Sequence, residues 1–424
     1  MTAVQKNEEV KVLRLTLHDR LVGYLAGFTS GRIVLTFAPE FRTDASRPTF
    51  SLITSPAFPN ADKLLSEPWK TNQKLHPTLS NLLPEGALRE LVAQGMKTHV
   101  DNEFQMLSYL GRDLPGALIA ETVSPEDVPN YLLSDNDKAR AVKFDADGVE
   151  GKFSLAGVQM KFSMKEKDGR YNFATGGDLG DWIVKTPSTK HQHVPLNEYT
   201  AMSLAALAGV DIPDIKLIEL RKLDGLPQIN LPDEELAFAV KRFDREGGQR
   251  VHMEDFAQVL VKYPQQKYDS ANYEQIAKVL YGFTEDGLAD VQQFARRLLV
   301  NILLANGDAH LKNWSLLYKN QINPRLSPAY DIVTTSVYIE DEKRYALNLG
   351  KTKEWFKVNQ AHFKAWADRS EIPWRAIKPH LDDTMEKARV LWPEALEELP
   401  MADQHKDKLR SHWRLLQDDF QISS

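Results

Sequence analysis

The chain has 424 residues, 42% of them hydrophobic, and a formal net charge of −6. This length exceeds that of one ordinary domain, so we expect two or three folded units with a large core. The lack of cysteine excludes disulfides, thiolate metal sites and a cysteine nucleophile, and the negative charge argues against a coat of nucleic acid over the whole surface.

The first 120 residues are predicted to form a β-rich N-terminal subdomain. Apolar and polar residues alternate there, with turn residues between the runs. Three strands are predicted: Val12–Leu15, Leu21–Leu25 and Arg32–Phe37. Two helices follow, one ending near residue 97 and one over Glu103–Leu110. Residues 121–150 are rich in Asp, Asn, Pro and Ser, so we expect a linker with surface helices.

Residues 151–245 form the next predicted unit, with features that suit phosphate binding. Lys152–Met164 indicates two strands joined across Ala156 and Gly157, where small residues let backbone N–H groups approach an anion. An ordinary β-turn has the same pattern. Asp181–Pro187 indicates a strand whose Lys185 suits the α- and β-phosphates of ATP. An edge-strand lysine facing water is the alternative.

Two further elements complete this unit. A helix is predicted to open at Asn197–Tyr199 and to end at Gly209. Glu198, near its start, could pair with Lys185 or simply interact with the helix dipole. Glu235–Phe243 is an apolar strand that leaves the unit, and its backbone N–H and C=O groups suit the edge of an adenine ring.

Residues 246–424 are predicted to be mainly helical. Six helices are expected, at about 253–262, 271–282, 286–305, 359–369, 373–391 and 403–420. Strands first and helices last are typical of an α+β protein. The basic segment Lys406–Arg414 fits a solvated helix face as well as a nucleic-acid patch. No apolar run reaches the roughly eighteen residues of a membrane span and no secretory signal is evident, so we expect a cytoplasmic protein without a membrane partner.

Asp308, Asn313 and Asp331 are the most informative residues. Trp314–Tyr318 and Arg325–Tyr330 flank turn residues, so a hairpin is predicted to return Asp331 to the neighbourhood of Asn313. A carboxylate for the hydroxyl proton, with an amide and a second carboxylate for Mg²⁺, are the groups that phosphoryl transfer requires. The Asp308–Asn313 pair alone is ordinary turn composition. With Asp331 and Lys185 added, the sequence predicts a kinase that uses ATP and Mg²⁺.

Seven motifs stand in an order that resembles the HipA family, the serine/threonine kinase toxins of HipBA toxin–antitoxin systems. They are Ser154–Lys161, Trp182–Pro187, Asn197–Tyr199, Ala239–Arg245, Glu254–Gln258, Asn306–Asn313 and Ser327–Asp331. Asn81–Gly86 and Leu110–Gly116 are similar to the family's N-terminal subdomain. The resemblance covers nearly the whole chain. It implies an α+β, two-lobed, protein-kinase-like fold with a β-rich N-terminal subdomain and an all-α C-terminal lobe.

The resemblance also implies roles for individual residues. Asp308 is the expected catalytic base, Asn313 and Asp331 the expected Mg²⁺ ligands, and Ser154 the expected autophosphorylation site. The expected ATP contacts come from four places: the phosphate loop (Ala156, Gly157, Val158, Gln159, Met160 and Lys161), Lys185, the adenine-binding hinge (Lys241, Arg242 and Phe243), and the catalytic segments (His310, Leu311, Lys312, Asn313, Tyr330 and Asp331). A purely structural histidine is the alternative for His310.

Partners are implied as well. The resemblance leads us to expect a HipB-like helix-turn-helix antitoxin dimer, operator DNA bound through the antitoxin complex with repression of the operon, and a protein substrate involved in translation, such as glutamyl-tRNA synthetase. Two alternatives stay open. One is a nucleotide-binding co-repressor with vestigial kinase activity, and the other is a small-molecule or lipid kinase with this fold.

Overall fold

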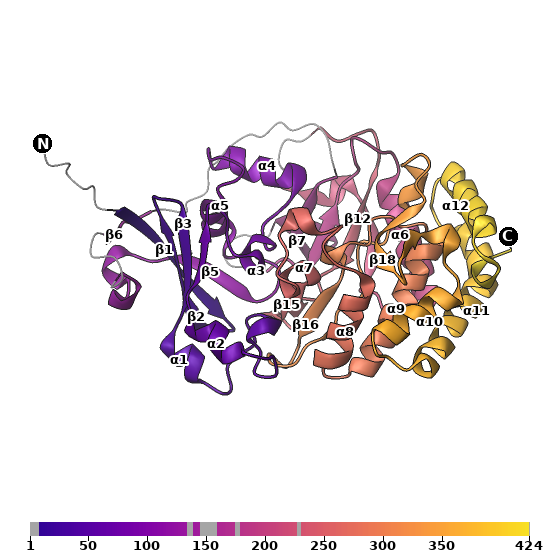
Figure 1. The fold of residues 1–424 in the computed structure, drawn as a ribbon. Coiled ribbons are helices and arrows are strands. Elements are labelled where there is room, and N and C mark those ends of the chain that lie inside the picture. Colours follow the sequence, from indigo (N-terminus) through magenta and orange to yellow (C-terminus); the bar gives the residue numbers. More distant parts are fainter. Residues whose placement is uncertain (1–7, 134–138, 145–158, 174–178, 227–229, 424) are drawn as a thin grey trace, which may run out of the picture. The chain divides into compact units, whose positions relative to one another are not determined.

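The computed structural model describes residues 8–133, 139–144, 159–173, 179–226 and 230–423 (Figure 1). The chain divides into two compact units. Unit 1 comprises Met1–Phe153, Glu246–Pro264 and Tyr318–Ile322, and unit 2 comprises Ser154–Arg245, Gln265–Leu317 and Asn323–Ser424. Two segments from the second half of the sequence therefore belong to the N-terminal unit.

Unit 1 is built on a sheet in the order β4-β3-β2-β1-β5, with β6 paired in parallel to β1. The strands are β1 (Glu8–Leu17), β2 (Arg20–Phe28), β3 (Arg32–Phe37), β4 (Trp69–Asn72), β5 (Leu118–Thr122) and β6 (Ala139–Ala141). His18 and Asp19, both with positive φ, form the two-residue turn between β1 and β2, because this backbone conformation matches the twist of a hairpin. The three strands predicted for this region are confirmed.

The core of unit 1 lies on one face of this sheet, where the alternate apolar residues of β1 meet short helices. The helices are α1 (Pro39–Thr43), α2 (Ala61–Ser66), α3 (Pro77–Ser80), α4 (Gly86–Gly95) and α5 (Glu103–Leu110). An aromatic cluster anchors the packing: the ring centroid of Phe37 lies 5.7 Å from that of Phe50 and 5.1 Å from that of Trp69.

Glu254 joins the segment 246–264 to the rest of unit 1. Its side chain is buried and accepts hydrogen bonds from Leu52 N at 2.7 Å and Ser51 Oγ at 2.8 Å. The hydroxyl of Tyr318 also donates to it. Burial raises the pKa of this carboxyl to about 7, although the three donors oppose the rise. One buried carboxyl therefore connects three segments that are far apart in sequence.

The segment 246–264 differs from its prediction. A helix is expected over about 253–262, but His252–Asp255 forms strand β15 and only Phe256–Val259 is helical, as α7. Asp255 caps this helix, since its side chain accepts from Gln258 N at 2.9 Å. Val261 then adopts a positive φ that ends it.

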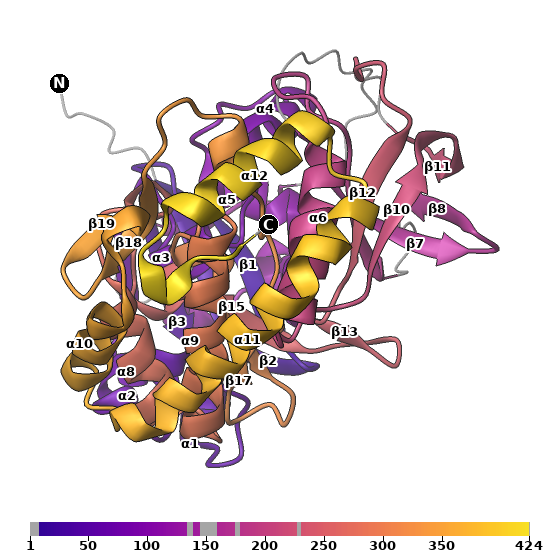
Figure 2. The same ribbon diagram turned by 90° about the vertical axis from the view of Figure 1, so that its right-hand side faces the viewer.

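Unit 2 begins with a second sheet, in the order β10-β12-β9-β7-β8-β11. All neighbours are antiparallel except β8 and β11. The strands are β7 (Lys161–Lys167), β8 (Arg170–Phe173), β9 (Trp182–Lys185), β10 (Ile215–Glu219), β11 (Leu223–Asp224) and β12 (Leu236–Lys241). Helix α6 (Val194–Leu207) packs against β10 and β12, as Figure 2 shows. Because β9 stands between β12 and β7 in this order, it is an interior strand of the sheet.

The rest of unit 2 is mainly helical, as expected. Its helices are α8 (Tyr273–Phe283), α9 (Gly287–Leu303), α10 (Gln360–Arg369), α11 (Trp374–Glu398) and α12 (Asp403–Leu415). Four fully buried tryptophans fill the space between them: Trp355, Trp366, Trp392 and Trp413. Of the five helices predicted beyond residue 270, all are confirmed. In the described part of the chain, none of the helices is long and apolar enough to cross a membrane.

Short strands also occur between these helices. The hairpin predicted after Trp314 is confirmed, with Leu316 opposite Leu326 in β16 and β17. Other short strands lie before the helices or between them. The bounds are β13 (Arg245–Glu246), β14 (Gln249–Arg250), β16 (Ser315–Tyr318), β17 (Arg325–Leu326), β18 (Arg344–Leu349) and β19 (Thr352–Glu354). The segment expected to be all-α therefore carries hairpins, one of which leads to Asp331.

Candidate active site

Lys185 occupies an interior position of the unit 2 sheet. It stands opposite Phe238 of β12 on one side and Lys161 of β7 on the other. Only 3% of the residue is exposed. The alternative interpretation of Lys185 as an edge-strand lysine facing water is therefore wrong. Lys185 is a buried residue of an interior strand.

The Lys185 ammonium lies between two carboxylates. Its Nζ donates to Glu198 Oε1 and to Asp331 Oδ1. Helix α6 begins at Val194, three residues before the predicted start, so Glu198 lies in its second turn and is buried. Glu198 therefore pairs with Lys185, while the helix dipole at the first turn contributes little to its position.

Asp331 holds two lysines together. Its carboxylate contacts Lys185 and also accepts from Lys161 Nζ at 3.1 Å. Like charges directly opposite each other on neighbouring strands repel, and Asp331 offsets this repulsion between Lys161 and Lys185. Asp331 has a φ of 55°, a left-handed conformation that costs energy for a residue other than glycine. The arrangement is therefore a charged cluster built from β7, β9, α6 and the segment after β17.

The pKa values reflect this cluster. Burial would raise the pKa of Asp331, but Lys161 and Lys185 hold it well below its usual range. Burial would lower the pKa of Lys185, but Asp331 and Glu198 raise it above its ordinary value. For Glu198 burial prevails over Lys185 and raises the pKa of the carboxyl. Asp331 is thus ionised, whereas Glu198 depends on Lys185 to stay charged.

Asp308 lies just after α9 in a loop fixed by amide side chains. Its backbone N–H donates to Asn306 Oδ1 at 3.1 Å, and Asn306 Nδ2 donates to Asn301 Oδ1 at 2.6 Å. Asn313 Nδ2 donates to the carbonyl oxygen of Asp308 at 2.9 Å. The Asp308 side chain is 53% exposed, and Tyr268 donates its hydroxyl to Asp308 Oδ1 at 2.7 Å. A rigid backbone therefore presents an accessible carboxylate.

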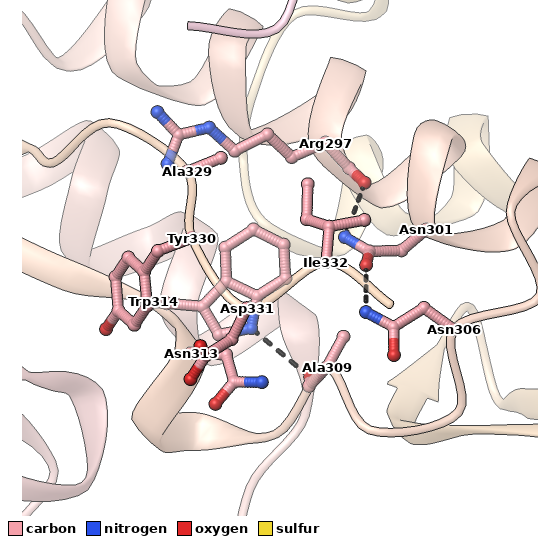
Figure 3. Close-up of a pocket in the computed structure, with 10 residues that line it drawn as sticks. All are labelled: Arg297, Asn301, Asn306, Ala309, Asn313, Trp314, Ala329, Tyr330, Asp331 and Ile332. Atoms are coloured by element: carbon pink, nitrogen blue, oxygen red, sulfur yellow. Dashed lines mark hydrogen bonds between the residues drawn. The ribbon is translucent and has the colours of Figure 1, made fainter. Parts of the chain in front are cut away.

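Asn313 and Asp331 line one small pocket (Figure 3). The other lining residues are Arg297, Asn301, Asn306, Ala309, Trp314, Ala329, Tyr330 and Ile332. The hydrogen bond from Asn313 Nδ2 to the loop leaves its Oδ1 available as a ligand. The hairpin thus brings together the amide and the carboxylate that the sequence predicts to be neighbours.

These residues fit a Mg²⁺ ion. Magnesium prefers oxygen ligands and is usually held by one or two protein groups together with substrate phosphates. Asp331 is an anion that already holds two cationic groups, and Asn313 supplies a neutral oxygen beside it. The donor set is therefore suitable in charge and in chemistry.

The expected phosphate loop is only partly described. Ser154, Ala156, Gly157 and Val158 lie outside the described residues. Met160 is buried, and its carbonyl oxygen accepts from Thr186 N at 3.0 Å. Lys161 reaches Asp331, as described above. The described end of this loop therefore runs directly beside the charged cluster.

The expected hinge has most of its backbone donors occupied. Lys241 N donates to Asp214 O and Arg242 N to Asp181 O, each at 2.8 Å. The Lys241 side chain pairs with Asp214 at 3.3 Å on the surface. The Phe243 ring packs on Tyr330 with a centroid distance of 5.5 Å. The N–H groups of Lys241 and Arg242 are thus already bonded within the protein and would not be free for an adenine edge.

The remaining predicted contacts lie around the catalytic loop. His310 is buried, with Nε2 4.0 Å from Asp308 Oδ1. Leu311 is fully buried, and Lys312 O accepts from the Tyr330 hydroxyl at 2.8 Å. These residues hold the loop on which Asp308 and Asn313 stand.

The sequence did not predict a role for three residues that support Asp308. Asn301 and Asn306 fix the backbone of Asp308, and Tyr268 contacts its carboxylate. Asn301 and Asn306, at the end of a mostly apolar helical run, were an available signal, because buried amides need partners. Nothing in the sequence pointed to Tyr268.

Comparison with known proteins agrees with this geometry. Residues 13–121 match the HipA N-terminal domain and residues 153–392 match the HipA-like C-terminal domain. A protein of Sinorhizobium fredii named as a candidate kinase is 37% identical over 95% of this chain and 97% of its own length. The serine/threonine-protein kinase toxin HipA of Shewanella oneidensis is 23% identical over 95% of this chain and 94% of its own length.

The fold has a counterpart among solved structures. The complex of HipA, HipB and operator DNA from Shewanella oneidensis MR-1 matches with a TM-score of 0.71 and 20% identity, over 95% of this chain and 97% of that chain. This similarity confirms the predicted α+β, kinase-like fold. Because the C-terminal domain match alone covers more than half of the sequence, the chain belongs to the HipA family of kinases.

Proposed function

We propose that this protein is an ATP- and Mg²⁺-dependent serine/threonine protein kinase that acts as the toxin of a HipBA-like pair. The observation that carries the proposal is the cluster of buried Lys185 and Glu198 with the half-buried Asp331, next to the loop with Asp308 and Asn313. A fixed ammonium and metal-binding oxygens beside an exposed carboxylate are the groups that phosphoryl transfer requires.

Each residue has a distinct part in this proposal. Asp308 accepts the proton of the attacking hydroxyl, and its exposure leaves room for an acceptor. Lys185 binds the α- and β-phosphates, with Glu198 holding the ammonium in place. Asn313 and Asp331 hold Mg²⁺, which when bound neutralises charge on the phosphate oxygens. Phe243 and Tyr330 lie near the adenine, and the loop from Ala156 to Lys161 contacts the phosphates.

The family relationship supports the proposed partners. The solved complex of the Shewanella protein contains HipB and operator DNA. We extend this to a HipB-like antitoxin dimer for the present chain, with operator DNA bound through that complex and repression of the operon. The substrate is proposed to be a translation-related protein such as glutamyl-tRNA synthetase, and Ser154 is proposed as a site of autophosphorylation.

The test is transfer of radiolabelled phosphate from ATP with Mg²⁺ to proteins of a cell lysate. Asp308→Asn should reduce transfer by on the order of 100-fold or more, because it removes the base and changes the charge of the site. Asp382→Asn is a matched control, since Asp382 is a surface carboxylate of α11 paired with Lys378. Equal transfer by the Asp308→Asn protein and the wild type would refute the proposal.

The same experiment separates the two alternatives. A co-repressor with vestigial activity would bind ATP without labelling any protein, whereas a small-molecule or lipid kinase would label a solvent-extractable product. The sequence carries all four groups Lys185, Asp308, Asn313 and Asp331, and we take this as support for an active rather than a vestigial kinase. Identification of the labelled protein band would name the substrate.

A further inference from the structure

Tyr268 occupies the place next to the proposed base where an acceptor hydroxyl would bind. Its phenolic hydroxyl donates to Asp308 Oδ1 at 2.7 Å, across 40 positions of sequence. A general base must lie within hydrogen-bonding distance of the proton that it removes, and this hydroxyl satisfies the condition. Tyr268 is also 38% exposed, so its ring is not locked inside the core.

The position of Tyr268 is maintained by several contacts. The neighbouring Lys267 carbonyl oxygen accepts from Leu311 N at 3.2 Å, which attaches this segment to the catalytic loop. The ring packs edge-on against His310, with 5.0 Å between centroids. Lys353 Nζ donates to Asp269 Oδ1, on the residue that follows Tyr268, at 2.9 Å. These contacts attach the segment that carries Tyr268 to the catalytic loop, next to Asp308.

We propose that Tyr268 is an internal phosphate acceptor of this kinase, an inference that rests on the proposed function. The phenolic oxygen forms a bond to the γ-phosphorus of ATP. The bond from that phosphorus to the β,γ-bridging oxygen breaks, ADP leaves, and the phenolic proton passes to Asp308. No other reactant is required.

The modification has a predictable physical effect on the site. A phosphate on Tyr268 carries roughly −1.5 to −2 charges at neutral pH. The phenolic hydrogen that now bonds to Asp308 is lost, and the phosphate repels the carboxylate. Tyr268 then moves away from Asp308, so the Asp308 carboxylate loses this hydrogen bond and is open to an external hydroxyl on both oxygens.

The test is phosphopeptide mapping by mass spectrometry after the purified full-length protein is incubated with Mg-ATP. The expected result is phosphate on Tyr268 in the wild type and none in the Asp308→Asn protein. Tyr281→Phe is a matched control, because Tyr281 is similarly exposed on α8, at 40%. It should leave the Tyr268 phosphopeptide unchanged, whereas Tyr268→Phe removes it.

A mixing experiment tests whether transfer is internal. When active protein is incubated with the Asp308→Asn protein carrying a mass tag, only the active chain should gain phosphate on Tyr268. Labelling of the tagged chain would overturn the intramolecular assignment. An unmodified Tyr268 in a sample that phosphorylates another protein would overturn the inference and leave the kinase intact. A sample that transfers no phosphate to any acceptor would refute both.

Discussion

Removal of the Lys185 ammonium should destabilise unit 2 as well as abolish phosphate transfer. In a Lys185→Met protein, Asp331 keeps Lys161 as a partner, but Glu198 is left buried without a cation. Breaking a buried ion pair by removing one partner costs about 3–5 kcal/mol. Because burial already raises the pKa of Glu198, this carboxyl takes up a proton, so we expect the lower end, about 3 kcal/mol.

A second substitution separates stability from catalysis. In Lys185→Met/Glu198→Gln the buried carboxyl is replaced by a neutral amide, so most of the lost stability should return. Phosphate transfer should stay low in both proteins, since the phosphate contact is missing. Lys165→Met is a control: Lys165 is an exposed lysine of β7 that pairs with Asp181 at 3.4 Å, and its loss should cost less than about 1 kcal/mol.

Urea unfolding followed by tryptophan fluorescence measures these differences. All tryptophans except Trp69 lie in unit 2, so the signal reports mainly on the unit that carries the mutation. If the double variant is no more stable than Lys185→Met, the reasoning fails, because Glu198 would not be the source of the cost. Full transfer activity in either protein would equally contradict the assigned phosphate contact.

Three other predictions concern single residues. Because burial raises the pKa of Glu254 to about 7, the stability that this carboxyl contributes is present below about pH 4.5 and is lost as the pH rises through about 7. Calorimetry from pH 5 to pH 8 should show a loss of about 3 kcal/mol that Glu254→Gln abolishes. Gly307→Ala should lower transfer and Tm together, because a Cβ there would lie 2.2 Å from Glu342 Oε1 and 3.0 Å from Arg344 O. Asn306→Ala should lower kcat with little change in KM for ATP, since it frees the backbone of Asp308, and unchanged kcat would contradict this positioning role.

The sequence alone predicted the parts of this protein that depend on local chemistry. The strands of unit 1 follow from alternation and turn residues, and most helices of unit 2 follow from their apolar period. The hairpin from Trp314 to Asp331 was predictable because its turn residues and its length set the pairing of its two strands. For the same reason the proximity of Asn313 and Asp331 follows from local sequence.

Only the tertiary structure decided how distant groups meet. Lys185 and Asp331 are 146 positions apart, and periodicity shows which face of an element is buried but not which element covers it. The two open alternatives for Lys185 and Glu198 were resolved by the interior place of β9 and by the packing of α6. The contact of Tyr268 with Asp308 likewise depends on packing between segments far apart in the sequence. So does the place of residues 246–264 in unit 1. The local sequence of one segment does not show which other segment it packs against.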